Sequence, residues 1–297
     1  MQEKLIIILI LLTIIKNGLF FTTKITHRSS VHQKTNLLYC SNFNIYIEHT
    51  DMFNVVYNAN YLSFIERAIS GRDMSNCRIT RFKTLKFRSP ARLGDKIQVN
   101  ITQSIGSNKM SSKVFSSSAE YSSCNNIEYQ KKFVRLNNII NINDVSEFNI
   151  ISGGKKHVSE FIVWADELGR EGYLISKTIL QLMERARTDI LGGPQVLAQI
   201  AKGSKHIYVA RISDFVIHAD ICLPSNDVPF HKVNVLTVCQ PLGSSSDLSE
   251  ISMLNFIQSI IDPISQNILA CSTVTCSCVD AQSGSPTFFS SDIAINF

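Results

Sequence analysis

The stretch that decides the fold is residues 45–68, IYIEHTDMFNVVYNANYLSFIERA. Its first residues, Ile45-Tyr-Ile-Glu-His-Thr, are interpreted as a strand. From Asn58 onward, apolar residues recur three and four positions apart at Leu62, Ile65 and Ile69, which predicts a helix with one buried stripe. Asp51 lies between the two, in a turn. We therefore expect a strand, a turn and a helix in this order.

The helix signature occurs twice in the chain. Glu66-Arg-Ala recurs 118 residues later as Glu184-Arg-Ala, again on a helical apolar pattern. A second correspondence places Ala91 opposite Ala219, 128 residues apart, and the Gly-rich stretch 192–203 accounts for the ten extra residues. Each half then reads as a strand, a helix and several strands. One helix on one antiparallel sheet covers its own edges poorly, whereas two such units side by side can do so.

Alternating segments supply further strands in both halves. We expect strands at Val99–Ile105, Lys113–Tyr121, Glu128–Leu136, Val233–Cys239, Glu250–Ile261 and Asn267–Val279, of which Glu250–Ile261 is equally compatible with a helix. An Asn/Ile-biased stretch followed by glycines reads as a linker. The expected division is a leader over 1–40, a first domain over 41–140, the linker over 141–157 and a second domain over 158–297.

Composition excludes several classes of protein. The chain has 297 residues, 44% of them hydrophobic and 18% charged, which argues for a packed core and against disorder. The first 40 residues carry five of the 29 Lys and Arg residues and one of the 24 Asp and Glu residues. The rest has a net charge of about +1, and we expect no nucleic-acid partner.

The first 40 residues resemble a targeting leader. Leu5–Ile15 is an apolar run flanked by Lys4 and Lys16, too short to span a bilayer comfortably and typical of a signal peptide. Residues 16–44 contain no acid and are rich in basic and hydroxyl side chains, as transit peptides are. Together they predict secretory-pathway entry and a bipartite route to a secondary plastid. An ordinary signal peptide of a secreted or organelle-lumen protein, or a weak anchor extended by residues 19–21, is the alternative. No stable membrane span is expected after leader removal.

The cysteine pattern does not indicate a metal centre. Among eight cysteines, Cys271, Cys276 and Cys278 form a C-x4-C-x-C pattern that matches no common zinc spacing. They lie in an alternating apolar stretch and are interpreted as thiols packed like small hydrophobic side chains. We expect neither a metal nor a cofactor.

Residues 45–68 resemble the opening motif of hotdog-fold thioesterases of the 4-hydroxybenzoyl-CoA thioesterase-like group. In that motif a strand is followed by a Thr-Asp pair, a Val-Val-Tyr-His-Ala-Asn-Tyr-Leu turn and a helix with Phe-x-Glu-x-Ala. Ser89-Pro-Ala-Arg-Leu-Gly-Asp extends the match, and the second half matches through its Glu-Arg-Ala helix and Val163-Trp-Ala-Asp. The resemblance implies an α+β double hotdog, with two long helices packed on one face of a continuous antiparallel sheet.

The resemblance also implies a site. An acid at the position of Asp51 acts on a thioester carbonyl as general base or nucleophile, and Tyr57, Asn58 and Asn60 position the substrate at the helix N-terminus. Unpaired N–H groups there suit a developing oxyanion. Two departures are clear: Asn58 stands where the family commonly has His, and residues 52–54 (Met-Phe-Asn) replace a Gly-containing approach. Asp51 as a purely local turn residue is the alternative.

Glu66 is a second candidate, because some hotdog thioesterases use a helix carboxylate. Its recurrence as Glu184, in each case beside an arginine, favours a charge at the helix interface instead. In the second half, either Gly169 or Leu168 takes the place of Asp51, and neither is an acid. We therefore expect a single site that hydrolyses acyl-CoA or acyl-carrier-protein thioesters, in a monomer or a homodimer of double hotdogs. The alternative is a catalytically inactive acyl-thioester binding or scaffold protein.

Overall fold

The computed structural model describes residues 35–51, 55–70, 77–104, 109–130, 136, 140–142, 154–169, 173–220, 230–243 and 250–289. The chain divides into two compact units, residues 1–33 and 34–297, and every described residue belongs to the second. Residues 1–34 of the expected leader therefore lie outside the described residues. The first strand begins at Thr35, so residues 35–40, which we assigned to the leader, belong to the sheet.

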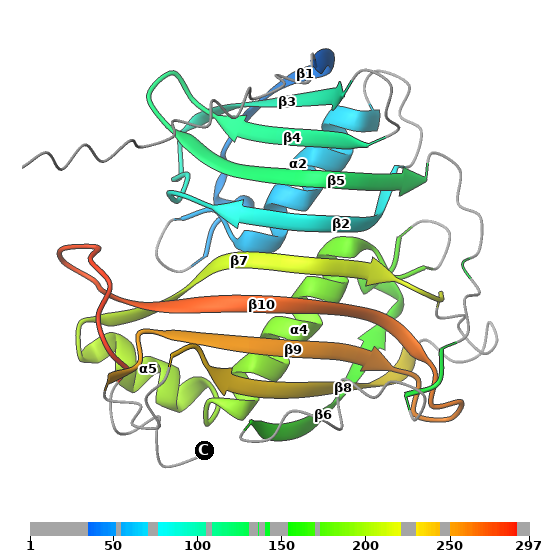
Figure 1. The fold of residues 1–297 in the computed structure, drawn as a ribbon, viewed down its shortest axis with the longest axis vertical. Coiled ribbons are helices and arrows are strands. Elements are labelled where there is room, and N and C mark those ends of the chain that lie inside the picture. The colour runs from blue at the N-terminus through cyan, green and yellow to red at the C-terminus, as the bar shows by residue number, and fades with distance from the viewer. Residues whose placement is uncertain are drawn as a thin grey trace, which may run out of the picture. The chain divides into compact units, whose positions relative to one another are not determined.

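One antiparallel sheet forms the body of the second unit (Figure 1). Its ten strands are arranged in the order β1-β3-β4-β5-β2-β7-β10-β9-β8-β6. Their bounds are β1 Thr35–Asn44, β2 Arg78–Phe87, β3 Lys96–Ser104, β4 Met110–Phe115, β5 Glu120–Gln130, β6 Lys155–Trp164, β7 Lys205–Ile217, β8 Phe230–Pro241, β9 Met253–Ile261 and β10 Ile268–Asp280. Strand β6 thus begins three residues inside the expected linker.

The two halves of the sheet mirror each other in order. Each half contributes five neighbouring strands, and β2 and β7 join the halves at the centre, where Arg81 pairs with Val216. The rings of Phe82 and Phe215 stack across this junction with centroids 4.8 Å apart. The strands of the two predicted repeats, five in each half, therefore form a single sheet.

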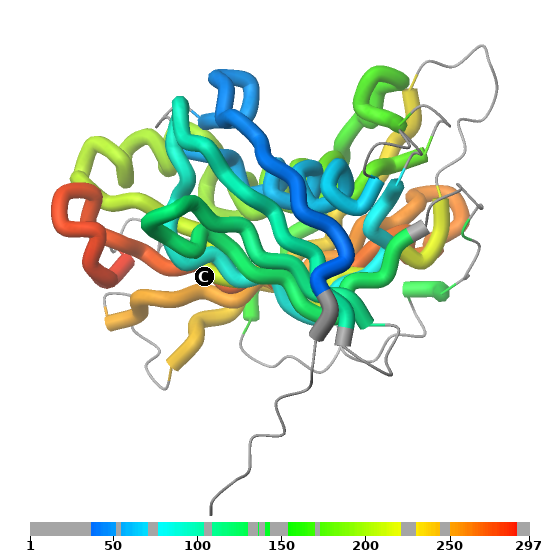
Figure 2. The backbone as a smooth tube through the Cα atoms, turned by 90° about the horizontal axis from the view of Figure 1, so that it is seen from above, coloured from blue at the N-terminus to red at the C-terminus, as the bar shows by residue number. Residues whose placement is uncertain are grey.

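Three α-helices accompany the described strands: α2 Asn58–Ser70, α4 Ser176–Ile190 and α5 Pro194–Lys202. Helix α2 contacts β1, β2 and β3, helix α4 contacts β6, β8, β9 and β2, and the two helices contact each other. In Figure 2 the strands of the first half curve beneath α2. No helix in the described part of the chain is long and apolar enough to cross a membrane.

The predicted helix stripes are the buried ones. In α2, Leu62, Ile65 and Ile69 are at most 1% exposed, and α4 buries the corresponding apolar positions against its own strands. Helix α5 was not predicted and occupies the extra stretch of the second half. It begins at Pro194 after Gly193, whose φ of +87° suits glycine, and proline at the first helical position requires no N–H.

Several strand predictions needed correction. The strand expected before Asp51 is instead a 3-10 turn, Ile47–His49, and only Thr50 pairs, with Val56. The expected strand Glu128–Leu136 overlaps only the last three residues of β5. The expected strand Lys113–Tyr121 covers a turn between β4 and β5, where the N–H of Ser116 donates to the carbonyl of Ala119. Hydroxyl side chains in residues 116–118 support this turn, since Ser116 bonds both the backbone and the side chain of Ser118. The ambiguous segment in the second half is the strand β9. The central strands β2 and β7 were not predicted.

Candidate functional site

A tight hairpin places Asp51 beside the start of α2. The N–H of Asp51 donates to the carbonyl of Val55 at 2.9 Å, and the N–H of Tyr57 donates to the carbonyl of His49 at 3.0 Å. The side chain of Asn60, in the first helical turn, donates to the same His49 carbonyl at 2.8 Å. Residues 49–51 are thereby tied to residues 55–60, and Asp51 is held at the approach to the helix.

The Asp51 carboxylate has a local contact of its own. Its Oδ1 accepts a hydrogen bond from the N–H of Val55 at 3.3 Å, and the side chain is half-buried. This is the turn contact that the alternative interpretation expects. It also orients the carboxylate relative to α2. Nearby, the ring of half-buried His49 lies edge-on to Phe64, with the centroids 5.1 Å apart.

The start of α2 lies where the sequence placed it. The helix begins at Asn58, and Asn60 is only 4% exposed. The first turn of a helix presents N–H groups without intrahelical acceptors, at the positive end of the helix dipole. Tyr57, Asn58 and Asn60 are therefore brought together with Asp51 in one segment, at an end that can stabilise negative charge.

The second half contributes to this centre through Glu184 of α4. The Glu184 carboxylate lies close enough to the Tyr57 hydroxyl to act on its ionisation. The pKa of Tyr57 is raised far above its ordinary value, first by burial and then by the charge and hydrogen bond of Glu184. Arg187, 3.9 Å from Glu184, opposes this shift, as does Arg185. A carboxylate from one half thus meets the helix N-terminus of the other.

The same backbone pattern recurs in the second half. Gly169 donates to the carbonyl of Tyr173 at 2.8 Å, as Asp51 does to Val55, and Leu168 pairs with Leu174, as Thr50 does with Val56. Gly169 is therefore the counterpart of Asp51, and the alternative with Leu168 in that place is wrong. A Cβ atom at Gly169 would lie 2.9 Å from Cγ2 of Ile175. The second half thus has neither the acid nor room for a side chain there.

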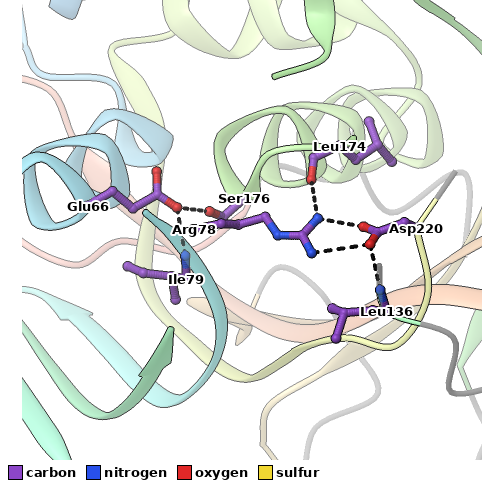
Figure 3. A network of polar contacts seen from close by, with 7 residues as sticks. All are labelled: Glu66, Arg78, Ile79, Leu136, Leu174, Ser176 and Asp220. Carbon is purple, nitrogen blue, oxygen red and sulfur yellow. Dashed lines mark hydrogen bonds and ion pairs between the residues drawn. The ribbon is translucent and has the colours of Figure 1, made fainter. Parts of the chain in front are cut away.

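Glu66 belongs to a second centre at the N-terminus of α4 (Figure 3). Its carboxylate accepts hydrogen bonds from the hydroxyl of Ser176, the first residue of α4, and from the N–H of Ile79 at 2.9 Å. Burial raises the pKa of Glu66 to about 7, although both hydrogen bonds and the charge of Arg78 lower it. Glu66 lies at the helix interface, as expected, but it accepts hydrogen bonds from Ser176 and Ile79 rather than pairing with an adjacent arginine.

A buried ion pair supports this second centre, and sequence reasoning missed it. Arg78 is 1% exposed and donates to both carboxylate oxygens of Asp220, at 2.5 and 3.3 Å. It also donates to the carbonyl of Leu174 at 3.4 Å, two residues before α4 (Figure 3). Asp220 in turn accepts from the N–H of Leu136 at 2.7 Å. The pair therefore connects β2, the end of β7, the approach to α4 and the segment at residue 136.

The candidate residues therefore divide between two centres. Asp51, Tyr57, Asn58 and Asn60 surround the start of α2, whereas Glu66 contacts the start of α4. Among the described residues, no cluster of three or more His, Cys, Asp or Glu side chains could hold a metal ion. The structure adds three residues that the sequence analysis did not name: Ser176, Arg78 and Asp220. Of these, only Ser176 could have been identified from the sequence, because it corresponds to Asn58, 118 residues earlier.

Comparison with solved structures agrees with the fold. A protein described as an oleoyl thioesterase from Lactobacillus plantarum superposes with a TM-score of 0.52 and 7% identity, covering 83% of this chain and 97% of that one. The 12:0-ACP thioesterase from Umbellularia californica superposes with a TM-score of 0.48 and 10% identity, and the match covers 84% of this chain and 94% of that one. An acyl-ACP thioesterase from Bacteroides thetaiotaomicron superposes with a TM-score of 0.48 and 8% identity, and the match covers 82% of this chain and 98% of that one.

The chain therefore has a double hotdog fold, as its opening motif predicted. No protein family's sequence profile matches the chain, and no curated protein matches it either. At these identities the likeness extends to the fold alone. The activity has to be argued from the two centres.

Proposed function

We propose that this protein hydrolyses acyl thioesters carried on coenzyme A or on acyl carrier protein, at a single centre built on Asp51. The observation that carries the proposal is the hairpin that holds Asp51 at the start of α2. Its counterpart Gly169 has neither an acid nor room for a side chain. The contact between α2 and α4 supports their placement on one face of the sheet, with the substrate between the halves.

The chemistry follows from these positions. Asp51 removes a proton from water, or attacks the carbonyl itself, while N–H groups in the first turn of α2 hold the oxyanion. Asn60 keeps that turn against the His49 carbonyl, and Tyr57 links it to Glu184. Asn58 lacks a titratable side chain, so proton transfer depends on Asp51.

A thiol-release assay tests the proposal. Wild type is assayed with aliphatic and aromatic acyl-CoAs of several lengths and with the corresponding acyl carrier protein thioesters. We expect Asp51→Asn to lower turnover at least about 100-fold without loss of fold. The matched control is Asp166→Asn, an exposed acid in the 3-10 turn Ala165–Glu167 of the second half, which is expected to change turnover by less than about tenfold. A large loss in Asp166→Asn alone would place the working centre in the other half.

Glu66 supports a second candidate function, catalysis by a helix carboxylate at the start of α4. The favouring observation is a carboxyl group with a pKa of about 7 that is hydrogen-bonded to Ser176. A loss of turnover in Glu66→Gln, with Asp51→Asn unaffected, would establish this alternative. If wild type binds acyl thioesters without releasing thiol, the protein is a binding or scaffold module.

The destination of the protein is a separate proposal. We propose that residues 1–34 act as a signal and transit leader to a secondary plastid, based on their composition. Fusion of these residues to a fluorescent reporter tests this, and a uniform cytosolic signal would refute it. Light scattering of the folded protein would show whether it forms a homodimer.

A further inference from the structure

A thiol and an imidazole lie against each other outside both centres. Nε2 of His218, just after β7, is 3.4 Å from Sγ of Cys271 on β10. The N–H of His218 donates to the carbonyl of Leu269 at 2.8 Å, which fixes the histidine backbone against the same strand. Strands β7 and β10 are neighbours near the middle of the sheet (Figure 1). The contact is thus held by two rigid elements.

Cys271 faces away from α4. The next residue, Ser272, donates to the sulfur of Met183 in α4, and successive side chains of a strand point to opposite faces. Cys271 pairs in register with Val216 on β7, which in turn pairs with Arg81 on β2. Residues directly opposite each other in an antiparallel ladder share a face. Arg81 and Cys271 therefore lie on the sheet face opposite the helix.

Three groups near the thiol bear on its reactivity. Burial, and then the charge of Arg81, lower the pKa of His218, so its imidazole is neutral near pH 7 and can accept the thiol proton at Nε2. The positive charge of Arg81 favours a thiolate. Ser259, directly opposite Cys271 on β9, is 0% exposed, and its hydroxyl has no hydrogen-bond partner among the described residues. That hydroxyl can donate to a charged sulfur.

Five of the six other described cysteines lack this combination, and the sixth, Cys77, is half-buried. Cys124, Cys239, Cys276 and Cys278 are buried, and burial raises the pKa of each thiol. Cys40 is exposed, but its sulfur accepts a hydrogen bond from the uncharged amide of Gln98. Cys271 is half-buried and has an imidazole beside it, with Arg81 two strands away on the same face. The arrangement distinguishes Cys271 from those five cysteines.

We propose that Cys271 is a reactive thiol, with His218 as its base, and that it exchanges with small-molecule disulfides. His218 takes the proton from Sγ, and the thiolate attacks one sulfur of the disulfide. A new S–S bond forms to Cys271, the original S–S bond breaks, and the leaving thiolate takes the proton from the imidazolium. No further oxidant is consumed. The site is independent of the proposed thioester chemistry.

Modification kinetics of the full chain test the proposal. The protein is incubated at pH 7 with glutathione disulfide, or with the aromatic disulfide dithiobis(nitrobenzoate), and each cysteine is followed by peptide mass spectrometry. We expect Cys271 to be modified at least about threefold faster than the more exposed Cys40. His218→Gln should slow Cys271 about tenfold or more and leave Cys40 unchanged. Modification of Cys271 more slowly than Cys40, or at the same rate in His218→Gln, would overturn the proposal.

A surface variant keeps the test informative if His218→Gln does not fold. Arg81 is exposed, so Arg81→Gln retains the fold, and it should slow Cys271 about two- to fivefold by removing a partly screened charge. Lys86→Gln, on the same strand and equally exposed, is the matched control and should leave the rate unchanged. Equal rates at Cys271 in Arg81→Gln and Lys86→Gln would contradict the proposed environment.

Discussion

Ionisation of Glu66 should make the stability of the fold depend on pH. Burial raises the pKa of this carboxyl group from 4.5 to about 7 in the folded chain. Between these values the folded state holds a proton that the unfolded state has released, so stability is greatest at low pH and is lost as the pH rises toward 7. The full shift corresponds to about 3 kcal/mol for one proton.

Urea unfolding at several pH values measures this effect. Other groups titrate as well, so the relevant quantity is the difference in unfolding free energy between Glu66→Gln and wild type. Glutamine resembles the protonated carboxyl and can still accept from Ile79. Between pH 5 and pH 8, we expect Glu66→Gln to gain about 2–3 kcal/mol of unfolding free energy relative to wild type. A difference that stays constant across this range would refute the argument.

Three other predictions concern stability. Arg78→Met should lower the free energy of urea unfolding by about 3–5 kcal/mol, because it leaves the buried Asp220 without its charge partner. The double variant Arg78→Met/Asp220→Leu should recover most of this loss. Gly169→Ala should lower the free energy of unfolding by about 1–3 kcal/mol, because the new methyl group crowds Ile175. In calorimetry, adding Ile175→Ala to Gly169→Ala should restore part of this loss. A chain that begins at Ser41 should melt more than about 5 °C below full length, because it lacks the first six residues of β1, which pair with β3. Equal melting temperatures would show that this part of the pairing adds no stability.

The fold could be predicted where its periodicity is simple. The helix stripes of α2 and α4 follow the helical period, and their repeat revealed the two halves. In β2, by contrast, the buried apolar residues are Ile79, Phe82 and Leu85, three apart, and the register shifts between Ile79 and Arg81. That spacing matches neither a strand nor a helix pattern. Arg78, a charged residue, is buried beside Ile79, which no apolar pattern indicates.

The candidate site was predictable only within each segment. The motif placed Asp51 seven residues before Asn58, and the hairpin brings both to the start of α2. The contacts of Tyr57 with Glu184 and of Glu66 with Ser176 join segments more than 100 residues apart. Which carboxylate meets which helix N-terminus is set by the docking of the two halves, and local periodicity carries no information about it.

The most direct test of a single working centre is the turnover of Asp51→Asn and Glu66→Gln, measured side by side on the best acyl-thioester substrate of the wild type. Both variants replace a carboxyl group with an amide of similar shape, so they differ mainly in which helix N-terminus loses its acid. We predict a loss of at least about 100-fold in kcat/KM for Asp51→Asn and of less than about tenfold for Glu66→Gln. Full activity in Asp51→Asn, with a large loss in Glu66→Gln, would contradict the account.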